Sequence, residues 1–223
     1  MAPTSPTTSQ LVTAVLILLP IFGAAIIAGQ RYRQLPGNLR CLAWLAWFEL
    51  PLDLGGEIMG LLQRNNLFIM PLYTVGEFWL LALMYRRTLQ SAAFNKVVPW
   101  LVGGFAAYAL LDSLLAADLT RFRPGQQVIQ GLLILAMVGL YFRKLLHELQ
   151  TRSLTREPMF WVSIGLFLYF VGYLQIALFS NYMMQHYSMA FNRNIWTIHT
   201  GLIILLHCCY CRALVIRPRP AQA

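Results

Sequence analysis

Charged residues are scarce in this chain of 223 residues. Only 11% of the residues are Asp, Glu, Lys or Arg, and 58% are hydrophobic, whereas soluble domains contain about 25% charged and about 45–50% apolar residues. A soluble protein of this length would need more charge to cover its surface. The composition therefore excludes an ordinary soluble domain and indicates a chain that is used mostly in crossing a membrane.

Lysine is almost absent, since fifteen of the seventeen basic residues are Arg and Lys occurs only at Lys96 and Lys144. The formal net charge of +9 would by itself fit a protein that binds nucleic acid. The basic residues lie instead in short clusters between apolar segments, as in loops that flank membrane spans. We therefore predict a lipid bilayer as the main partner and no nucleic acid.

Basic residues are also missing from the start of the chain. A secretory signal begins with Lys or Arg, and Met1–Gln10 contains neither, so the first apolar stretch is predicted to be a true span. A helix needs about 20 mostly apolar residues to cross a bilayer. The sequence predicts an all-α polytopic membrane helix bundle, one domain over residues 1–223, with seven transmembrane helices. The predicted spans are 11–29, 39–62, 68–85, 97–117, 126–142, 159–180 and 195–211.

The distribution of basic residues predicts the orientation. Cytoplasmic segments carry the excess of Lys and Arg. With the N-terminus outside and the C-terminus in the cytoplasm, thirteen basic residues fall on inner segments and four on outer ones. One missed or invented helix would break this alternation, so the same bias supports seven spans.

Cysteine is rare as well. The four cysteines, Cys41, Cys208, Cys209 and Cys211, fall near the predicted cytoplasmic face, where structural disulfides are rare. They are either small apolar residues at helix ends, or the last three form an acylation site, because juxtamembrane cysteines can carry palmitate.

Several cofactor sites lack their residues. The last predicted span has no Lys, which excludes a retinal Schiff base. His199 and His207 lie about 12 Å apart along their helix axis, so they cannot share one metal ion. His147 and His186 fall in predicted loops, which removes the usual ligands for haem or catalytic zinc. No Ser-His nucleophile motif and no Gly-rich phosphate loop occurs, and we assign no cofactor.

A stripe of carboxylates marks the second span. Glu49, Asp53 and Glu57 are spaced i, i+4, i+8, so they lie within about 80° on one helix face. Like charges at this spacing repel, and ionisable groups in a membrane usually face the bundle interior. They must be partly protonated, paired with His199 or neutralised by a bound cation. Pro51 and Gly55-Gly56 interrupt the same span, which favours a cavity there or close packing through small residues.

Other spans place polar groups at matching depths. From a rise of about 1.5 Å per residue, Glu57, Asp112 and His199 lie about 8 Å outward of the midplane. Asp53 and Glu77 lie near the midplane, and Glu49 and His207 lie about 4 Å inward. We expect a polar cavity in the outer half of the bundle, with Glu57 paired to His199. The alternative is a hydrogen-bonded core network that only links the helices. The predicted ligand- or ion-binding residues are Glu49, Asp53, Glu57, Glu77, Asp112, Gln175 and His199, and Glu57, Asp112 and His199 are candidates for a metal ion.

Two motifs, Tyr73-Thr74-x-x-Glu77-Phe78 and Ile195-Trp196-x-Ile198-His199, stand beside Phe160-Trp161 and Tyr169-Phe170-x-Gly172 in the sixth predicted span. The combination resembles a group of bacterial seven-helix inner-membrane proteins of about this length, whose function is unassigned. The resemblance covers nearly the whole chain. It implies a location in the bacterial inner (cytoplasmic) membrane. It also implies that Glu77 and His199 belong to the sequence pattern of the family, but it implies no reaction.

The two motifs also resemble each other. Each has an aromatic residue, Thr and an aliphatic residue, followed within two residues by Glu77 or His199. Seven helices with the N-terminus outside permit a parallel three-plus-one-plus-three repeat, as in the SWEET sugar transporters. Chance also explains so short a match.

Three functions remain open. The first is binding of a small polar solute or cation for transport or sensing. The second is an intramembrane metal-assisted hydrolase acting on lipid, with a carboxylate–His cluster that activates water. The third is a purely structural bundle. A sensor needs an output partner, and the Arg143–Pro158 loop, with its four basic residues, is the predicted contact for a cytoplasmic partner or anionic lipid.

Overall fold

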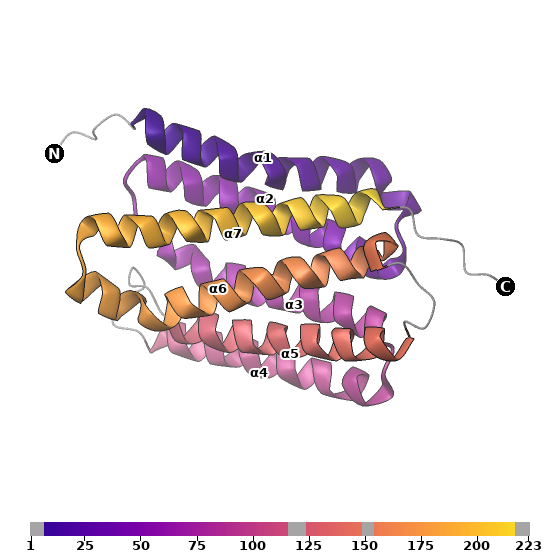
Figure 1. Ribbon diagram of the computed structural model, residues 1–223. Coiled ribbons are helices and arrows are strands. Elements are labelled where there is room, and N and C mark those ends of the chain that lie inside the picture. The colour runs from indigo at the N-terminus through magenta and orange to yellow at the C-terminus, as the bar shows by residue number, and fades with distance from the viewer. Residues whose placement is uncertain (1–6, 116–123, 149–153, 217–223) are drawn as a thin grey trace.

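The computed structural model describes residues 7–115, 124–148 and 154–216, and within them every regular element is helical. The α-helices are α1 Thr8–Arg31, α2 Gly37–Leu61, α3 Met70–Leu89, α4 Ala92–Leu114, α5 Pro124–Glu148, α6 Pro158–His186 and α7 Met189–Val215. Short 3₁₀ turns lie at Tyr32–Gln34, Leu67–Ile69 and Leu154–Arg156. Successive helices run antiparallel, so the start of α1 and the end of α7 lie at opposite ends of the bundle (Figure 1).

Six of these helices are long and apolar enough to cross a membrane: α1 and α3 to α7. The exception is α2, which has 25 residues but carries Arg40 and the three carboxylates of the stripe. Large apolar side chains cover the outside of the bundle, with Trp100 82% and Leu115 84% exposed. An apolar exterior of this kind suits a multi-pass membrane protein.

The helices extend beyond the predicted spans at several polar ends. Ser91 caps α4 and Ser188 caps α7, each accepting a hydrogen bond from a backbone N–H in the first turn. At the other end of α7, Arg212 still lies within the helix. Residues 116 and 117, the predicted end of the fourth span, lie outside the described residues. Pro51 and Gly55-Gly56 do not end α2, which continues through them to Leu61.

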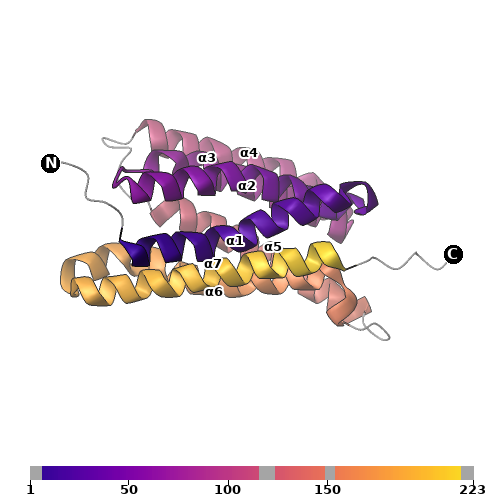
Figure 2. The same ribbon diagram turned by 90° about the horizontal axis from the view of Figure 1, so that it is seen from above.

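Six helices form a closed ring. Contacts join α1 to α2, α2 to α3, α3 to α5, α5 to α6, α6 to α7 and α7 back to α1. The seventh, α4, packs on α3 outside this ring and lies at the edge of the bundle in both views (Figures 1 and 2). Only Val98, Phe105 and Ala109 of α4 are buried. A polar residue on α4 is therefore separated from the ring interior.

The seam between α1 and α7 is polar at one end. The Arg31 guanidinium donates hydrogen bonds to the carbonyls of Leu214, at 2.6 Å, and Val215. These carbonyls belong to the last turn of α7, which has no partners within the helix. One cation on the first helix therefore caps the last one.

The two halves of α2 differ in their surroundings. Its buried residues all lie between Leu39 and Glu49, where they pack in the core with Tyr85 and Tyr210. From Leu50 to Leu61 no residue is fully buried. The second half of α2 therefore borders open space, and Asp53 and Glu57 lie on this half.

Candidate functional site

A cavity of about 250 Å³ lies inside the ring, between the second half of α2 and helices α3, α6 and α7. It extends from the α2–α3 connection at Asn66 and Leu67 to Glu77 and His207 in the middle of the bundle. The polar lining residues are Asp53, Glu57, Asn66, Tyr73, Glu77, Tyr169, Tyr173, His199 and His207. No Lys or Arg lines this cavity in the part of the chain that the structure describes.

The half nearer the connection holds two carboxyl groups of α2. Asp53 of α2 and Tyr73 of α3 both line this half of the cavity. The second oxygen of Asp53, Oδ2, is buried without a hydrogen bond. Asn66 closes this end, since its amide donates to the carbonyl of Gly56 at 3.1 Å. Asp53 therefore keeps one acceptor for a further donor inside the cavity.

Aromatic rings form the opposite wall. Tyr169 and Tyr173, one turn apart on α6, are stacked with their ring centroids 5.5 Å apart. The His199 ring of α7 lies 4.8 Å from that of Tyr173, and its Nε2 is 3.3 Å from the hydroxyl of Tyr169. This wall and the carboxylates of α2 and α3 line the same cavity.

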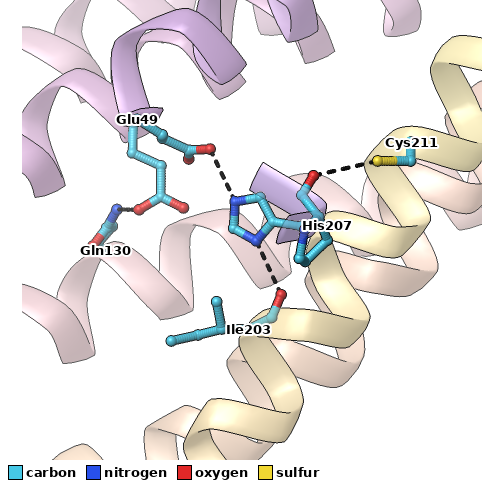
Figure 3. A network of polar contacts seen from close by, with 7 residues as sticks. Glu49, Gln130, Ile203, His207 and Cys211 are labelled. Carbon is cyan, nitrogen blue, oxygen red and sulfur yellow. Dashed lines mark hydrogen bonds and ion pairs between the residues drawn. The ribbon is translucent and has the colours of Figure 1, made fainter. Parts of the chain in front are cut away.

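A buried polar cluster forms the inner end. Glu77, 5% exposed, accepts a hydrogen bond of 2.7 Å from the Gln130 amide of α5, which also donates to the carbonyl of Thr74 at 3.2 Å. From α2, Glu49 points at the His207 ring of α7, with Oε2 3.5 Å from Nε2 (Figure 3). Groups from four helices thus meet at one level.

The orientation of His207 follows from its second nitrogen. Nδ1 lies 2.9 Å from the carbonyl oxygen of Ile203 (Figure 3), so it must carry a hydrogen and donate. Nε2 then faces Glu49, yet neither Nε2 nor Oε2 of Glu49 has a hydrogen bond of good geometry. A buried polar atom without a partner is rare in native proteins, so this end of the cavity has unused hydrogen-bonding capacity.

The structure brings together most of the residues predicted to bind a ligand. Asp53, Glu57, Glu77 and His199 all line the cavity, and Glu49 contacts its inner end through His207. Glu49 and His207, which the rise per residue placed at the same depth, lie 3.5 Å apart.

Two predicted residues lie elsewhere. Asp112, on the outer helix α4, accepts a hydrogen bond of 2.6 Å from Gln126 of α5. Gln175 is exposed on α6. Asp112 is separated from the cavity because α4 lies outside the ring.

The structure also differs from the predicted pair of Glu57 with His199 and from the predicted metal ligands Glu57, Asp112 and His199. His199 contacts Tyr169 rather than Glu57, and the Glu–His contact between α2 and α7 is two turns deeper, at Glu49 and His207. Asp112 is not with Glu57 and His199. Among the described residues, no group of three or more His, Cys, Asp or Glu side chains is placed to hold a metal ion.

The sequence did not lead us to predict the tyrosines Tyr73, Tyr169 and Tyr173 as residues of the site. Tyr169 and Tyr173 share one face of α6 because they are four residues apart, and Tyr73 lies four residues before Glu77. The spacing was visible, but aromatic residues at helical spacing are usually core residues, so it carried no specific signal.

Comparison with known proteins adds no assignment. The chain matches no protein-family model, no curated protein and no solved structure. Its function is therefore argued from the chemistry of the cavity.

Proposed function

We propose that this chain is a seven-span membrane protein that binds a small, positively charged solute in the cavity, for transport or sensing. The observation that carries the proposal is the lining: Asp53, Glu57 and Glu77 face the space together with tyrosine rings, and none of the described lining residues is Lys or Arg. Carboxylates attract a cation, and tyrosine faces add cation–π attraction.

Unsatisfied groups support binding over a purely structural network. Oδ2 of Asp53, Oε2 of Glu49 and Nε2 of His207 are buried without hydrogen bonds. A network that only joined helices would satisfy its own polar atoms. A bound cation with hydrogen-bond donors, such as a primary amine or a hydrated ion, supplies what these oxygens lack.

The volume supports a small solute. Pockets for drug-sized ligands measure about 300–1,000 Å³, and this cavity of about 250 Å³ lies just below that range. Selectivity for one solute over another would come from the carboxyl groups of Asp53 and Glu57 and from the aromatic wall of Tyr169 and Tyr173.

Seven spans with the N-terminus outside agree with the charges at the helix ends. Basic residues lie in or near the last turns of α1, α3, α5 and α7 and the first turns of α2 and α4, whereas Arg64 and Arg193 lie at the opposite end. Cytoplasmic ends carry the basic excess. In this orientation the cavity opens at the outer face, beside the α2–α3 connection.

The order of helices in the ring supports transport in particular. A parallel repeat would relate α1, α2 and α3 to α5, α6 and α7, with α4 as the odd helix. The contacts α3–α5 and α7–α1 are equivalent under such a repeat. Repeats of this kind underlie alternating access in small transporters.

Binding is tested on purified protein in detergent by thermal unfolding. We expect an organic cation such as ethanolammonium, or an inorganic cation, to raise the stability. A ligand at about 100 times its Kd contributes roughly 2.7 kcal/mol. Asp53→Asn and Glu57→Gln should abolish the shift, whereas the matched Asp112→Asn, outside the cavity, should keep it.

Stabilisation by neutral or anionic solutes, with none by cations, would overturn the proposal. Metal analysis of the same preparation separates the remaining candidates. A stoichiometric metal lost in Glu57→Gln would favour the metal-assisted hydrolase instead.

A further inference from the structure

A second cavity lies at the other end of the bundle, where α3 and α5 end and α4 begins. It has a volume of about 360 Å³. Three apolar residues, Leu89, Phe94 and Leu140, form part of its wall, and the polar part consists of Ser91, Arg143, Lys144 and His147. No Asp or Glu is among these lining residues, so the charged groups in the described wall of the pocket are all basic.

Lys144 is held in place at this pocket. Its Nζ donates hydrogen bonds to the carbonyls of Thr88, at 2.9 Å, and Leu89, at 3.2 Å. These carbonyls belong to the last residues of α3. The ammonium charge is therefore fixed against the pocket wall rather than free in solvent.

Arg143 and His147 are exposed and lie four residues apart on α5, on one helix face. Their side chains are long enough to fold over a ligand in the pocket. Across from them, α4 begins with Ser91, whose hydroxyl accepts from the Phe94 N–H at 3.4 Å and keeps its own hydrogen to donate. The N-terminus of a helix attracts anions, and here the start of α4 lines the same pocket as the cations Arg143 and Lys144.

The surroundings extend the pocket toward apolar surface. Leu140 lies one turn further into the bundle than Lys144, and the next turns of α4 expose Val97 and Trp100. The described backbone contacts of α4 are mainly with α3, and its printed hydrogen bonds to α5 come from Gln126, at the opposite end of α5 from this pocket. An anion with an apolar tail fits this arrangement better than a free ion.

We propose that this pocket binds a phosphate group carried by an anionic phospholipid. Arg143 and His147 contact the phosphate oxygens, Lys144 provides a fixed charge beside them, and Ser91 donates a hydrogen bond. The acyl chains run along the apolar surface between α4 and α5. The proposal needs the membrane placement but is independent of what the acidic cavity binds.

The test uses full-length purified protein in detergent, with thermal unfolding and native mass spectrometry as readouts. The probes are phosphatidylglycerol, phosphatidylcholine and inorganic phosphate. We expect phosphatidylglycerol to stabilise the protein and to remain bound in the gas phase more than phosphatidylcholine. Arg143→Gln should weaken its apparent affinity about fivefold, since a basic residue near an anionic lipid contributes about that factor.

Arg156→Gln is the matched control, because it removes the same charge from an exposed position at the same end of the bundle. An equal loss in both variants would mean general surface attraction and would overturn the pocket. Equal stabilisation by millimolar inorganic phosphate, again lost in Arg143→Gln, would assign the site to free phosphate instead of lipid. Both variants change exposed side chains, so folding is expected to survive.

Discussion

At the scale of single residues, the contact between Glu49 and His207 determines the inner end of the acidic cavity. Glu49 is 2% exposed and His207 3% exposed, and each comes from a different side of the ring. The Ile203 carbonyl fixes the imidazole, so one nitrogen always faces the carboxyl group. Two buried polar groups that depend on each other in this way should be coupled energetically.

We therefore predict a non-additive pair. His207→Ala should cost about 3–5 kcal/mol of unfolding free energy, as when one partner of a buried pair is removed. Glu49→Gln with His207→Ala should cost less than the sum of the single changes. The measurement is a double-mutant cycle by denaturant unfolding in detergent.

Glu57→Gln with His199→Ala is the control cycle. The described structure shows no ion pair or hydrogen bond between these two residues, so their effects should add within about 0.5 kcal/mol. Additive effects at Glu49 and His207 would show that their contact has no energetic role.

Gln130 and Gln127 make a second test on one helix. Both are 2% exposed, but Gln130 donates to Glu77 and to the Thr74 carbonyl, whereas Oε1 of Gln127 has no hydrogen-bond partner. Gln130→Leu should destabilise the protein by about 1–3 kcal/mol, because it leaves Oε2 of buried Glu77 without its donor. Gln127→Leu should be neutral or stabilising. Equal effects in thermal unfolding would contradict the assigned network.

The carboxylate stripe could be predicted from sequence because i, i+4 spacing determines a helix face. Its partners could not, because rise per residue gives the depth of a side chain but not the direction in which its helix faces. Asp112 was grouped with the cavity residues by its predicted depth, but it lies on a helix outside the ring. Gln175 lies on the right helix but is exposed.

At the scale of elements, the seam between α6 and α7 depends on two glycines. A Cβ on Gly165 would lie 2.8 Å from Cβ of Cys209, and one on Gly172 would lie 2.5 Å from Cδ1 of Leu202. Small residues let membrane helices approach closely. The two sites differ in what stands in the way, since Leu202 presents the end of a flexible side chain and Cys209 presents an atom next to its backbone.

Gly165→Ala should therefore destabilise the protein more than Gly172→Ala, by about 1–3 kcal/mol as for overpacked cores. Gly139→Ala on α5 meets nothing within 4 Å and should be neutral or slightly stabilising. Thermal unfolding of the three variants side by side gives the order. A larger loss for Gly172→Ala would mean that the backbones do not approach as described.

Helix existence was predictable and helix ends were not. Each predicted span corresponds to one helix, because long apolar runs can be satisfied in lipid only as helices. Hydropathy does not detect the part of a helix that consists of polar residues. For this reason the predicted span begins at residue 195, whereas α7 begins at Met189. Capping by Ser188 sets that start, and hydropathy does not report caps.

At the scale of the whole molecule, the proposed orientation is open to direct test. Reporters fused after Arg87 and after Arg156 should be cytoplasmic, and one fused after Gln63 should be external, because the basic residues gather at the first two positions. Phosphatase and fluorescent reporters, active on opposite sides of the membrane, provide the readout. Finding Gln63 and Arg87 on one side would contradict a span at α3.

The order of helices around the ring was beyond sequence reasoning. Neighbours in sequence are usually neighbours in space, and this holds for α1 to α4. The contact of α3 with α5, which leaves α4 outside, depends on side chains such as Gln130 reaching Glu77 across the interface. A single sequence does not reveal which partner an interior glutamine will have.

The contact between α1 and α7 has a consequence for biosynthesis. The ribosome delivers α1 before the other six helices and α7 after them, so the ring can close only after α7 has been synthesised. Until then Arg31 lacks its acceptors, the carbonyls of Leu214 and Val215, and Glu49 lacks the imidazole of His207. Between the synthesis of α2 and that of α7, helix α2 lacks this neighbour beside Glu49. During this interval the insertion machinery or α3 must cover the exposed side of α2. The ring is complete once α7 packs against α1 and α6.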